Sequence, residues 1–385
     1  MKILVTLKDI ENPHGRGGIA HYYRSLRPYL AEEVVYFTIG KRKDRRGRFD
    51  DFRRLFSDYW RFWREVPNFD LVNLNPSLGR AGLLRDGVHL LLAKVRKRKV
   101  VVFFRGWSRA AEKGIDRRWR SLFRFIFGSA DGLIVLSAEF KEKLRTWGCS
   151  APIWIETTTV SEELLKQVVP SQKESGWCHL LFLARIEKGK GIYAALGAQE
   201  ILSQKGLRTR LTVVGEGTER KSAEEWMRKR KIPDVEFAGY LDGDRKAAVL
   251  NAADIYLFPS THGEGMPNSV LEAMAFGLPV VTTPVGGLAE FFEDGKMGIR
   301  LAGADAEEMA ARLEKLVEDR ELRSKIGVFN FEYARKNFRA SVVAKRLQAI
   351  WEKVVVPFAE EESEGSWMSG FFPFDGKAME REGGQ

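Results

Sequence analysis

The chain has 385 residues, 44% of them hydrophobic and 30% charged, which excludes a disordered protein and leaves room for two domains. No apolar run approaches the roughly 18 residues of a membrane-spanning helix, and the apolar start MKILVTL is too short for a signal peptide, so we expect a cytoplasmic protein. Residues 1–170 hold 33 Lys and Arg against 19 Asp and Glu, a balance of +14, whereas the remainder holds 30 against 33, a balance of −3. Such a basic first half suits an anionic membrane surface, an acidic glycan or nucleic acid, and a solvated basic face is the alternative.

Strands and helices alternate through the first part of the chain. Strands are expected at 2–7, 34–39, 70–74, 100–104 and 132–136, and helices at 19–30, 80–93, 117–127 and 138–147. This alternation with short connections predicts a parallel sheet with helices on both faces. The loop NPHGRGG at 12–18 joins the first strand to the first helix, an arrangement that suits a phosphate.

The segment from Lys41 to Arg64 combines basic and aromatic residues. It begins KRKDRRGR and continues as an expected helix whose aromatic stripe is Phe49, Phe52, Phe56, Tyr59, Trp60 and Trp63. Because arginines stand beside the stripe, this helix can lie on an anionic membrane surface. Equally, the stripe can pack against the sheet while the arginines stay solvated.

The second half continues the alternation after a polar stretch at 160–175 that predicts a linker. Strands are expected at 179–184, 211–214 and 235–237, and helices from 192 and at 305–316, 321–326 and 341–355. The first two of these strands lead into glycine-containing loops that begin with Arg185 and Gly215. The acidic tail that follows residue 356 is expected to be flexible.

Two carboxylates, Glu264 and Glu272, stand in the stretch 259–295. Glu264 lies in a glycine-flanked loop, and Glu272 follows Ser269 by three positions, a spacing typical of a capping box that opens a helix ending at Gly277. The N-terminus of such a helix suits a phosphate, and both carboxylates can accept hydrogen bonds from hydroxyl groups. The stretch therefore predicts a pocket for a phosphorylated sugar, with a purely structural capping role as the alternative for Glu272.

The same stretch resembles the donor-site signature of the retaining glycosyltransferases of family 4. In that signature seven residues separate two glutamates, and Ala-Met and Gly-x-Pro-Val-Val follow. The matching positions are Glu264, Gly265, Pro267, Glu272, Ala273, Met274, Gly277, Pro279, Val280 and Val281. A second family pattern, Arg followed after four residues by Lys-Gly, is matched by Arg185 and Lys190, with Lys188 as the lower-ranked lysine. The resemblance covers residues 1 to about 355 and is denser in the second half.

This resemblance implies an α/β fold called GT-B, in which two Rossmann-like doubly wound domains face each other across a cleft and the last helix crosses back to the first domain. We therefore expect an N-terminal acceptor-side domain at 1–170, a nucleotide-sugar donor domain at 171–338, a crossover helix at 339–356 and the tail at 357–385. The implied activity is that of a metal-independent retaining hexosyltransferase that needs no cofactor. It moves a sugar from a nucleoside-diphosphate sugar, with a UDP-sugar favoured and GDP-mannose next, to a glycan or lipid-linked acceptor in surface polysaccharide or glycolipid synthesis.

Residue roles follow from the positions that match the family. Glu272 is expected to bind the ribose hydroxyls and Glu264 the donor sugar. Arg185 and Lys190 are expected to stabilise the charge that develops on the leaving diphosphate. Further donor contacts are expected at Gly17, Gly18, Gly215, Tyr240, Leu241, Gly265, Met266, Pro267, Asn268 and Ser269.

The segment VVFFRGW departs from the family, which often has His-Gly where this chain has Arg105-Gly106. A guanidinium stays protonated and cannot act as a base, but it can hold a phosphate or an anionic acceptor. Arg105 and Trp107 are therefore expected on the acceptor side.

No metal site is expected. Asp242-Gly243-Asp244 is interpreted as a turn with a helix N-cap, and Cys149 and Cys178 as core residues without a disulfide.

Two other functions stay open. One is a nucleotide-sugar epimerase with the GT-B fold, against which the glutamate block argues. The other is a nucleic-acid-binding protein that uses the basic half, which would leave the donor block unexplained, so nucleic acid is not expected as a partner.

Overall fold

A computed structural model describes residues 1–7, 10, 18–31, 33–39, 48–169, 176–261 and 263–356, without the side chains of 48–52, 54 and 55. The chain divides into two compact units. The first unit contains residues 1–24 and 29–156 and the chain from residue 344, and the second unit contains residues 25–28 and 157–343.

Six parallel strands form the sheet of the first unit. In spatial order they are β2 (Glu33–Thr38), β1 (Lys2–Leu7), β3 (Leu71–Leu74), β5 (Lys99–Phe103), β7 (Gly132–Val135) and β8 (Ile153–Ile155). Ile3 of β1 is in register with Val34 of β2 and with Leu71 of β3. A separate pair joins β4 (Ser77–Leu78) to β6 (Gly106–Trp107). The strand residues are almost entirely buried except in edge strands, as expected for a parallel sheet covered on both faces.

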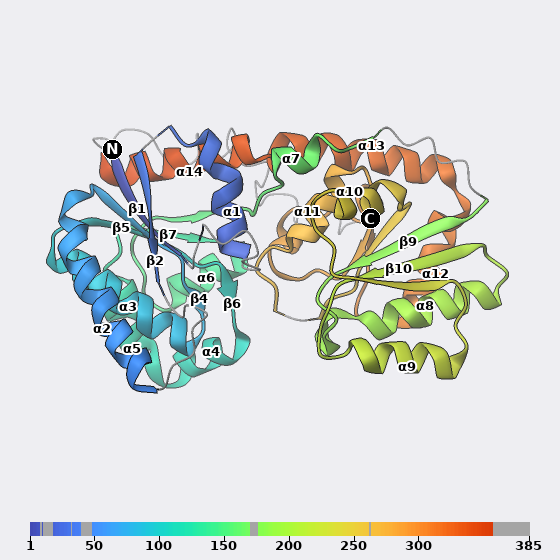
Figure 1. Ribbon diagram of the computed structural model, residues 1–385, viewed down its shortest axis with the longest axis horizontal. Coiled ribbons are helices and arrows are strands. Elements are labelled where there is room, and N and C mark those ends of the chain that lie inside the picture. Colours follow the sequence, from blue (N-terminus) through green and yellow to red (C-terminus); the bar gives the residue numbers. More distant parts are fainter. Residues whose placement is uncertain are drawn as a thin grey trace, which may run out of the picture. The chain divides into compact units, whose positions relative to one another are not determined.

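Helices cover this sheet on both faces (Figure 1). They are α1 (Gly18–Leu26), α2 (Arg48–Glu65), α3 (Arg80–Val95), α4 (Arg109–Gly114), α5 (Arg120–Phe127) and α6 (Ala138–Thr146). Short 3₁₀ turns cover Arg27–Tyr29 and Val66–Asn68, and Ile115–Trp119 forms a π-helical turn between α4 and α5. The main core of the unit lies between one face of the sheet and helices α2, α3, α5 and α6.

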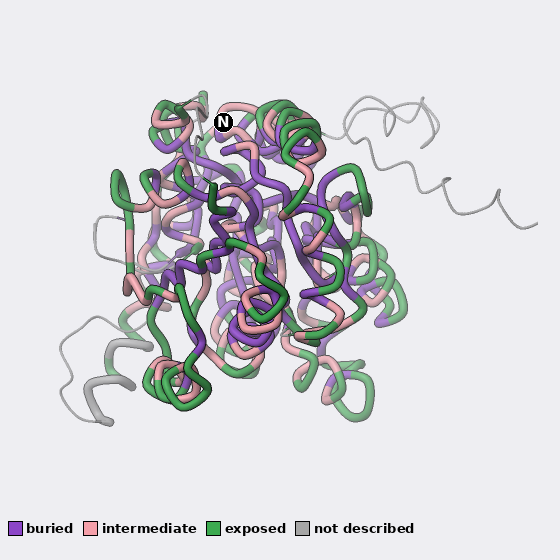
Figure 2. Tube along the Cα trace, turned by 90° about the vertical axis from the view of Figure 1, so that its right-hand side faces the viewer, coloured by how far each residue is buried: buried purple, intermediate pink, exposed green. Residues whose placement is uncertain are grey.

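The second unit is built in the same way around a second parallel sheet. Its strands, in spatial order, are β11 (Val235–Gly239), β10 (Thr209–Val214), β9 (Cys178–Leu183), β12 (Ile255–Phe258), β13 (Val280–Thr282) and β14 (Gly298–Arg300). Its helices are α7 (Glu162–Leu165), α8 (Ile192–Gln204), α9 (Arg220–Arg230), α10 (Gly243–Ala252), α11 (Asn268–Ala275), α12 (Ala306–Glu318) and α13 (Arg320–Asn337), with 3₁₀ turns at Lys188–Lys190 and Gly286–Glu290. Apart from the edge strand β11, these strands consist mostly of buried residues. Buried stretches of the tube lie toward the inside and exposed stretches toward the outside (Figure 2).

The last helix, α14 (Ala340–Val355), belongs to the first unit from residue 344 onward. Its Trp351 is fully buried and donates from Nε1 to Oδ1 of Asn73 at 2.8 Å. Its Arg346 makes a buried ion pair with Glu156, with Nη2 at 2.6 Å from Oε1. These two contacts confirm that the closing helix returns to the first unit.

The expected α/β fold with two Rossmann-like parallel sheets is confirmed, but several details differ. The units separate at residues 156 and 157 rather than at 170. The expected linker is ordered over 160–169, where Ser161 Oγ caps α7 by accepting from the Leu164 amide at 3.2 Å. The helix expected at 321–326 extends over 320–337. Strands β8, β12, β13 and β14 have no counterpart among the expected strands.

None of the helices in the described ranges is both long and apolar enough to cross a lipid bilayer.

Candidate functional site

The carboxyl ends of the strands in the second sheet gather most of the loops selected from the sequence. The chain runs from β9 outward to β10 and β11, and then returns to β12 on the other side of β9 before it continues to β13 and β14. The order of the strands therefore reverses between β9 and β12. In open parallel sheets this reversal leaves a crevice at the carboxyl ends, where ligands bind. The loops after β9 and β12 carry Lys190 and Glu264.

Lys190 and Glu264 form an ion pair at this position. The Lys190 ammonium contacts Oε1 of Glu264, and the two side chains are 7% and 15% exposed. Ser260 Oγ donates to the same carboxylate oxygen at 3.1 Å. The amide of Thr261 donates to the carbonyl of Gly189 at 2.9 Å and joins the two loops. Residues 74 positions apart thus place a cation and a carboxylate together at the reversal of strand order.

Two glycines allow the loops to approach this closely. Gly191 has a φ of +79°, and a Cβ atom there would lie 2.2 Å from the Pro259 carbonyl oxygen. Gly286 has a φ of +54°, and its Cβ atom would lie 2.3 Å from the carbonyl oxygens of Glu264 and Gly265. Any other residue would have to push the loop of Glu264 away.

Glu272 lies inside α11 and is 4% exposed. It does not take part in a capping box, because the helix starts at Asn268 with Pro267 in the N-cap position and no side-chain capping bond. Its Oε1 atom instead accepts from Lys246 Nζ at 2.8 Å, in a pair whose side chains are 17% and 6% exposed. The capping alternative for Glu272 is therefore wrong, and the contact that the structure gives its carboxylate is the ion pair with Lys246. Lys246, on α10, has no place in the sequence motif and was not expected at the site.

Tyr256 is a second residue that the motif does not identify. It is fully buried in β12 and donates from its hydroxyl group to the Leu183 carbonyl oxygen at 2.9 Å. Burial raises the pKa of Tyr256 far above its ordinary value, and the charges of Glu272 and Glu264 act in the same direction. This tyrosine therefore stays a neutral hydrogen-bond donor within electrostatic range of both carboxylates.

Arg185 is not brought into contact with this cluster. Its side chain is 66% exposed, and Nη1 lies 2.6 Å from Oε1 of Glu187. Lys188 is also exposed, whereas Lys190 is buried. Of the cations after β9, Lys190 is thus the one that the fold fixes, while the Arg185 side chain projects into solvent.

The other expected donor residues lie in loops at the same edge of the sheet. Gly215 follows β10 with a φ of +142°, where a Cβ atom would lie 1.9 Å from the Ala184 carbonyl oxygen. Tyr240 and Leu241 follow β11, with Tyr240 46% exposed. The positions before and at the start of α11 are buried or half-buried: Gly265, Met266, Pro267, Asn268 and Ser269. His262 lies outside the described residues.

In the first unit, Gly18 is the first residue of α1, and Gly17 lies outside the described residues. Trp107 does not offer a binding surface. It is 5% exposed, its ring stacks on Phe140 and Trp147 with interplanar angles of 5° and 4°, and its Nε1 atom donates to Glu112 at 2.7 Å. The expectation that Trp107 contacts an acceptor is therefore corrected: this tryptophan is part of the core.

Arg105 differs from Trp107 because one of its donor atoms has no hydrogen-bond partner among the described residues, whereas the indole nitrogen of Trp107 already donates to Glu112. Its guanidinium lies 3.9 Å from the ring centre of Tyr22 and 4.3 Å from that of Phe103. Within the described part of the chain, its buried Nη1 atom has no hydrogen-bond partner, and neither does the hydroxyl group of Tyr22. Burial raises the pKa of that hydroxyl group far above its usual range. Just beyond the carboxyl end of β5, the guanidinium thus lies over the ring of a tyrosine that stays neutral.

Asp242 occupies the N-cap position of α10, as expected, but makes no side-chain capping bond. Among the described residues, no group of three or more His, Cys, Asp or Glu side chains is arranged to hold a metal ion.

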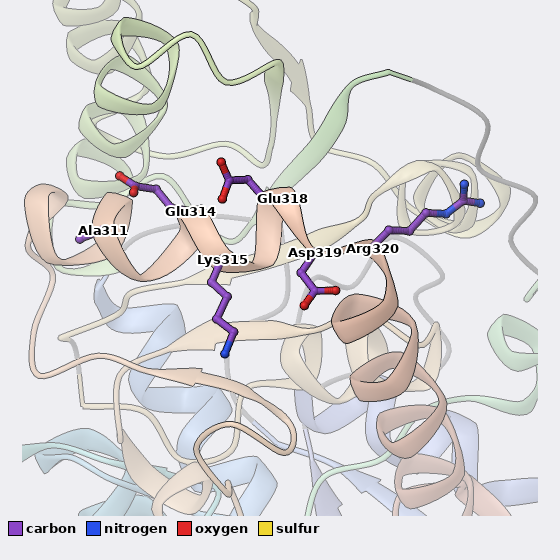
Figure 3. Close-up of a pocket in the computed structure, with 6 residues that line it drawn as sticks. All are labelled: Ala311, Glu314, Lys315, Glu318, Asp319 and Arg320. Carbon is purple, nitrogen blue, oxygen red and sulfur yellow. The ribbon is translucent and has the colours of Figure 1, made fainter.

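A hollow between α12 and α13 is lined by Ala311, Glu314, Lys315, Glu318, Asp319 and Arg320 (Figure 3). Its charged side chains point to different sides of the helix (Figure 3), and it contains none of the residues selected from the sequence.

Parts of the chain are similar to known proteins. Residues 168–333 match the family model described as glycosyl transferases group 1. The chain is 29% identical over 218 residues to glycogen synthase of Mycobacterium tuberculosis, covering 56% of this chain and 51% of that protein. It is 27% identical over 186 residues to the capsular polysaccharide biosynthesis glycosyltransferase CapM of Staphylococcus aureus, covering 48% of this chain and 47% of that protein. The chain thus spans about half the length of these curated relatives.

Among solved structures, HepE of Anabaena in complex with UDP matches with a TM-score of 0.71 and 16% sequence identity. The match covers 92% of this chain and 100% of HepE. A sucrose-phosphate synthase of Thermosynechococcus elongatus matches with a TM-score of 0.68 and 18% identity, over 92% of this chain and 99% of that chain. At such identities the likeness concerns the fold. The chain therefore has the GT-B fold, and its residues 168–333 are similar to the glycosyl transferases group 1 family.

Proposed function

We propose that this protein is a metal-independent retaining glycosyltransferase that moves a hexose from a nucleoside-diphosphate sugar to a glycan or lipid-linked acceptor. The observation that carries the proposal is the pairing of Lys190 with Glu264 and of Lys246 with Glu272 at the carboxyl edge of the second sheet. The buried carboxylate of Glu272 and the half-buried one of Glu264 can accept hydrogen bonds from sugar hydroxyls, and the buried Lys190 can neutralise a phosphate. The match of this segment to the group 1 family model supports the same activity.

Each residue has a stated role in the proposed reaction. Glu272 accepts hydrogen bonds from the ribose, and Glu264 orients the donor sugar. Lys190 faces the diphosphate, and the exposed Arg185 exchanges Glu187 for a phosphate oxygen when the donor binds. The bond between the anomeric carbon and the phosphate oxygen breaks while the acceptor oxygen bonds to the same face of that carbon. The acceptor proton passes to the leaving phosphate, so no covalent intermediate with the enzyme is formed.

A UDP-sugar is the proposed donor, and GDP-mannose is the next candidate. Solved structures of HepE with UDP and with UDP-glucose support this order. A setting in polysaccharide synthesis is supported by relatives such as CapM. The membrane contact expected for Lys41 to Arg64 is part of the same proposal. Residues 41–47 lie outside the described residues, and in α2 the exposed Phe56 and Trp60 support such a contact.

Lys190→Ala tests the role of the fixed cation, with Lys188→Ala as the matched control. Loss of one preorganised charge that stabilises the leaving group is expected to lower kcat of sugar transfer by about 10²- to 10³-fold. The exposed Lys188 is expected to contribute less than about threefold, as a solvated surface charge. The measurement is release of nucleoside diphosphate from the donor with acceptor present. Equal losses in both variants would contradict the assignment of Lys190.

We further propose that Arg105 holds an anionic group of the acceptor. Its buried Nη1 atom has no hydrogen-bond partner within the described ranges, and this donor supports such a role. Arg105→Gln keeps hydrogen-bonding capacity but removes the charge. It is expected to raise the KM for an acceptor that carries phosphate or carboxylate by about tenfold or more, with the KM for the donor unchanged. An unchanged acceptor KM would contradict this role.

A further inference from the structure

Large apolar side chains are exposed in an uneven way across the molecule. Fourteen such residues are exposed in the described ranges, and eight of them lie on α2, α3 and α5 or on the turn that leads into α5. These three helices are neighbours: α3 contacts both α2 and α5, and Figure 1 shows them side by side on one face of the first sheet. Exposed apolar groups concentrated in this way mark an interaction surface.

Helix α3 forms the centre of this surface. Leu84, Val88, Leu91 and Val95 recur at intervals of four, three and four positions and therefore share one side of the helix. Leu84 is 71%, Val88 38% and Val95 68% exposed, and Leu91 is half-buried. The opposite side of α3 is buried against the core through His89, Leu90 and Ala93. The helix thus has two apolar sides, and only one of them is used in the fold.

Helices α2 and α5 extend the apolar side of α3 in both directions. In α2, Tyr59 packs on His89 of α3 with ring centres 4.9 Å apart, while Phe56 and Trp60 remain 69% and 54% exposed. In α5, Ile126 packs closely against Gly87 of α3. A Cβ atom added at this glycine would lie 3.2 Å from the Ile126 side chain. Leu122 and Phe125, on the neighbouring part of α5, are 47% and 70% exposed.

Basic residues outnumber acidic ones around this surface, since α2, α3, α5 and the turn Ile115–Trp119 together hold 12 Lys and Arg against 6 Asp and Glu. The only acidic residue in α3 and α5 is Asp86, which is fully buried and paired with Arg85 at 2.6 Å. Arg53 lines a hollow on α2 together with Phe56 and Trp60, and Arg64 lies 4.7 Å from the ring centre of Trp60. Exposed arginines stand in and before α5 at positions 117, 118, 120 and 124.

We propose that the α2–α3–α5 surface, defined by Phe56, Trp60, Leu84, Val88, Leu122 and Phe125, docks on the headgroup region of an anionic lipid bilayer. An apolar surface with aromatic side chains and a basic surround is the pattern of proteins that lie in the membrane interface. A second copy of the chain is disfavoured as the occupant, because a symmetric contact would bring the same arginines together. Nucleic acid is disfavoured because the aliphatic ridge of α3 neither stacks on bases nor binds phosphates. This docking rests on the membrane contact of α2 in the proposed function and extends it to α3 and α5, but its test in vesicles needs no sugar transfer.

Co-sedimentation of the full chain with lipid vesicles tests the proposal. Wild type is expected to bind vesicles that contain phosphatidylglycerol and to bind neutral phosphatidylcholine vesicles at least about tenfold more weakly. The difference is expected to shrink in about 1 M salt, which screens surface charges within about 3 Å. Equal binding to both kinds of vesicle would overturn the proposal, as would no binding to either.

The double variant Leu84→Glu/Phe125→Glu changes two exposed side chains and is expected to lower binding to anionic vesicles by at least about tenfold, because it removes apolar contact and adds like charge. Val169→Glu/Val328→Glu is the matched control, since both valines are exposed in the second unit at 63% and 58%. The control is expected to bind as wild type does. Unchanged binding of the first variant overturns the assignment. A second result would also overturn the assignment: light scattering that shows a dimer for wild type and a monomer for Leu84→Glu/Phe125→Glu. In that case a second copy of the chain, and not a bilayer, covers the α2–α3–α5 surface. Unchanged thermal midpoints show that both variants are folded.

Discussion

Lys246 is the residue at the site whose role depends most on the fold. It stands at a position of α10 that is 26 residues from Glu272 in sequence, yet its Nζ atom lies 2.8 Å from that carboxylate. A buried carboxylate is costly unless it is paired. Lys246 therefore fixes the orientation of Glu272, and we expect it to act as a positioning residue for the nucleoside part of the donor.

Lys246→Met is expected to destabilise the protein by about 2–4 kcal/mol, because it leaves the Glu272 carboxylate buried without its partner. Lys246→Met/Glu272→Gln is expected to recover a large part of this loss, since neither charge then remains. Urea unfolding gives both values, and Lys229→Met in an exposed pair with Glu225 is the control, with an unchanged midpoint expected. A double variant no more stable than the single variant would show that the ion pair is not the cause.

The positions of Glu264, Glu272, Arg185 and Lys190 could be selected from the sequence because short motifs keep them in register. Their partners could not be selected. The contact of Lys190 with Glu264 joins two loops that only the β9–β12 pairing brings together, and Lys246 belongs to no motif. The capping box was wrong for a local reason: Pro267 starts the helix earlier, so that Ser269 lies inside it.

At the scale of elements, the packing of α2 on α3 contains a titratable group. His89 is 1% exposed, its ring centre lies 4.7 Å from that of Phe62, and its Nδ1 atom lies 2.9 Å from the Arg85 carbonyl oxygen. Burial lowers the pKa of His89 to about 4, below its ordinary value of 6.5. The unfolded chain therefore binds a proton at a higher pH than the folded protein does.

Stability is expected to fall as the pH drops from 6.5 to about 4, because protonation of His89 favours the unfolded chain in this window. The contribution of this residue amounts to as much as about 3 kcal/mol. His89→Leu removes the titrating group, so the variant is expected to lose less stability than wild type between pH 7 and about 4.5. Urea unfolding at several pH values measures this difference. Parallel pH profiles for the two proteins would contradict a neutral buried His89.

Element prediction succeeded where the apolar period was long and the ends were marked. The strands at 2–7 and 132–136 and the helices at 80–93 and 138–147 agree with β1, β7, α3 and α6 within a few residues. The aromatic stripe of α2 was harder to assign. Some of its residues pack into the fold, as one interpretation held, and others stay exposed, as contact with a membrane would require. Phe62 is fully buried and Tyr59 is half-buried, whereas Phe56 and Trp60 are exposed. A helical period shows which residues share a side but not which sides find a partner.

At the scale of the molecule, the two units divide the chemistry unevenly. The second unit holds the paired carboxylates and the segment that matches the group 1 family. The first unit holds Arg105, the α2–α3–α5 surface and most of the excess positive charge. The total charge of +11 hides this division, which is visible only when the halves are counted separately.

We propose above all that the second unit binds a nucleoside-diphosphate sugar through Glu272 without a metal ion. Thermal unfolding in chelator, with a panel of nucleoside diphosphates and their sugars, tests it most directly for wild type, Glu272→Gln and the exposed control Glu225→Gln. A ligand at about 100 times its Kd is expected to raise the midpoint by about 5 °C or more. We expect a nucleotide-selective shift, largest for UDP compounds, in wild type and the control but not in Glu272→Gln. No shift in wild type, or an equal shift in Glu272→Gln, would contradict it.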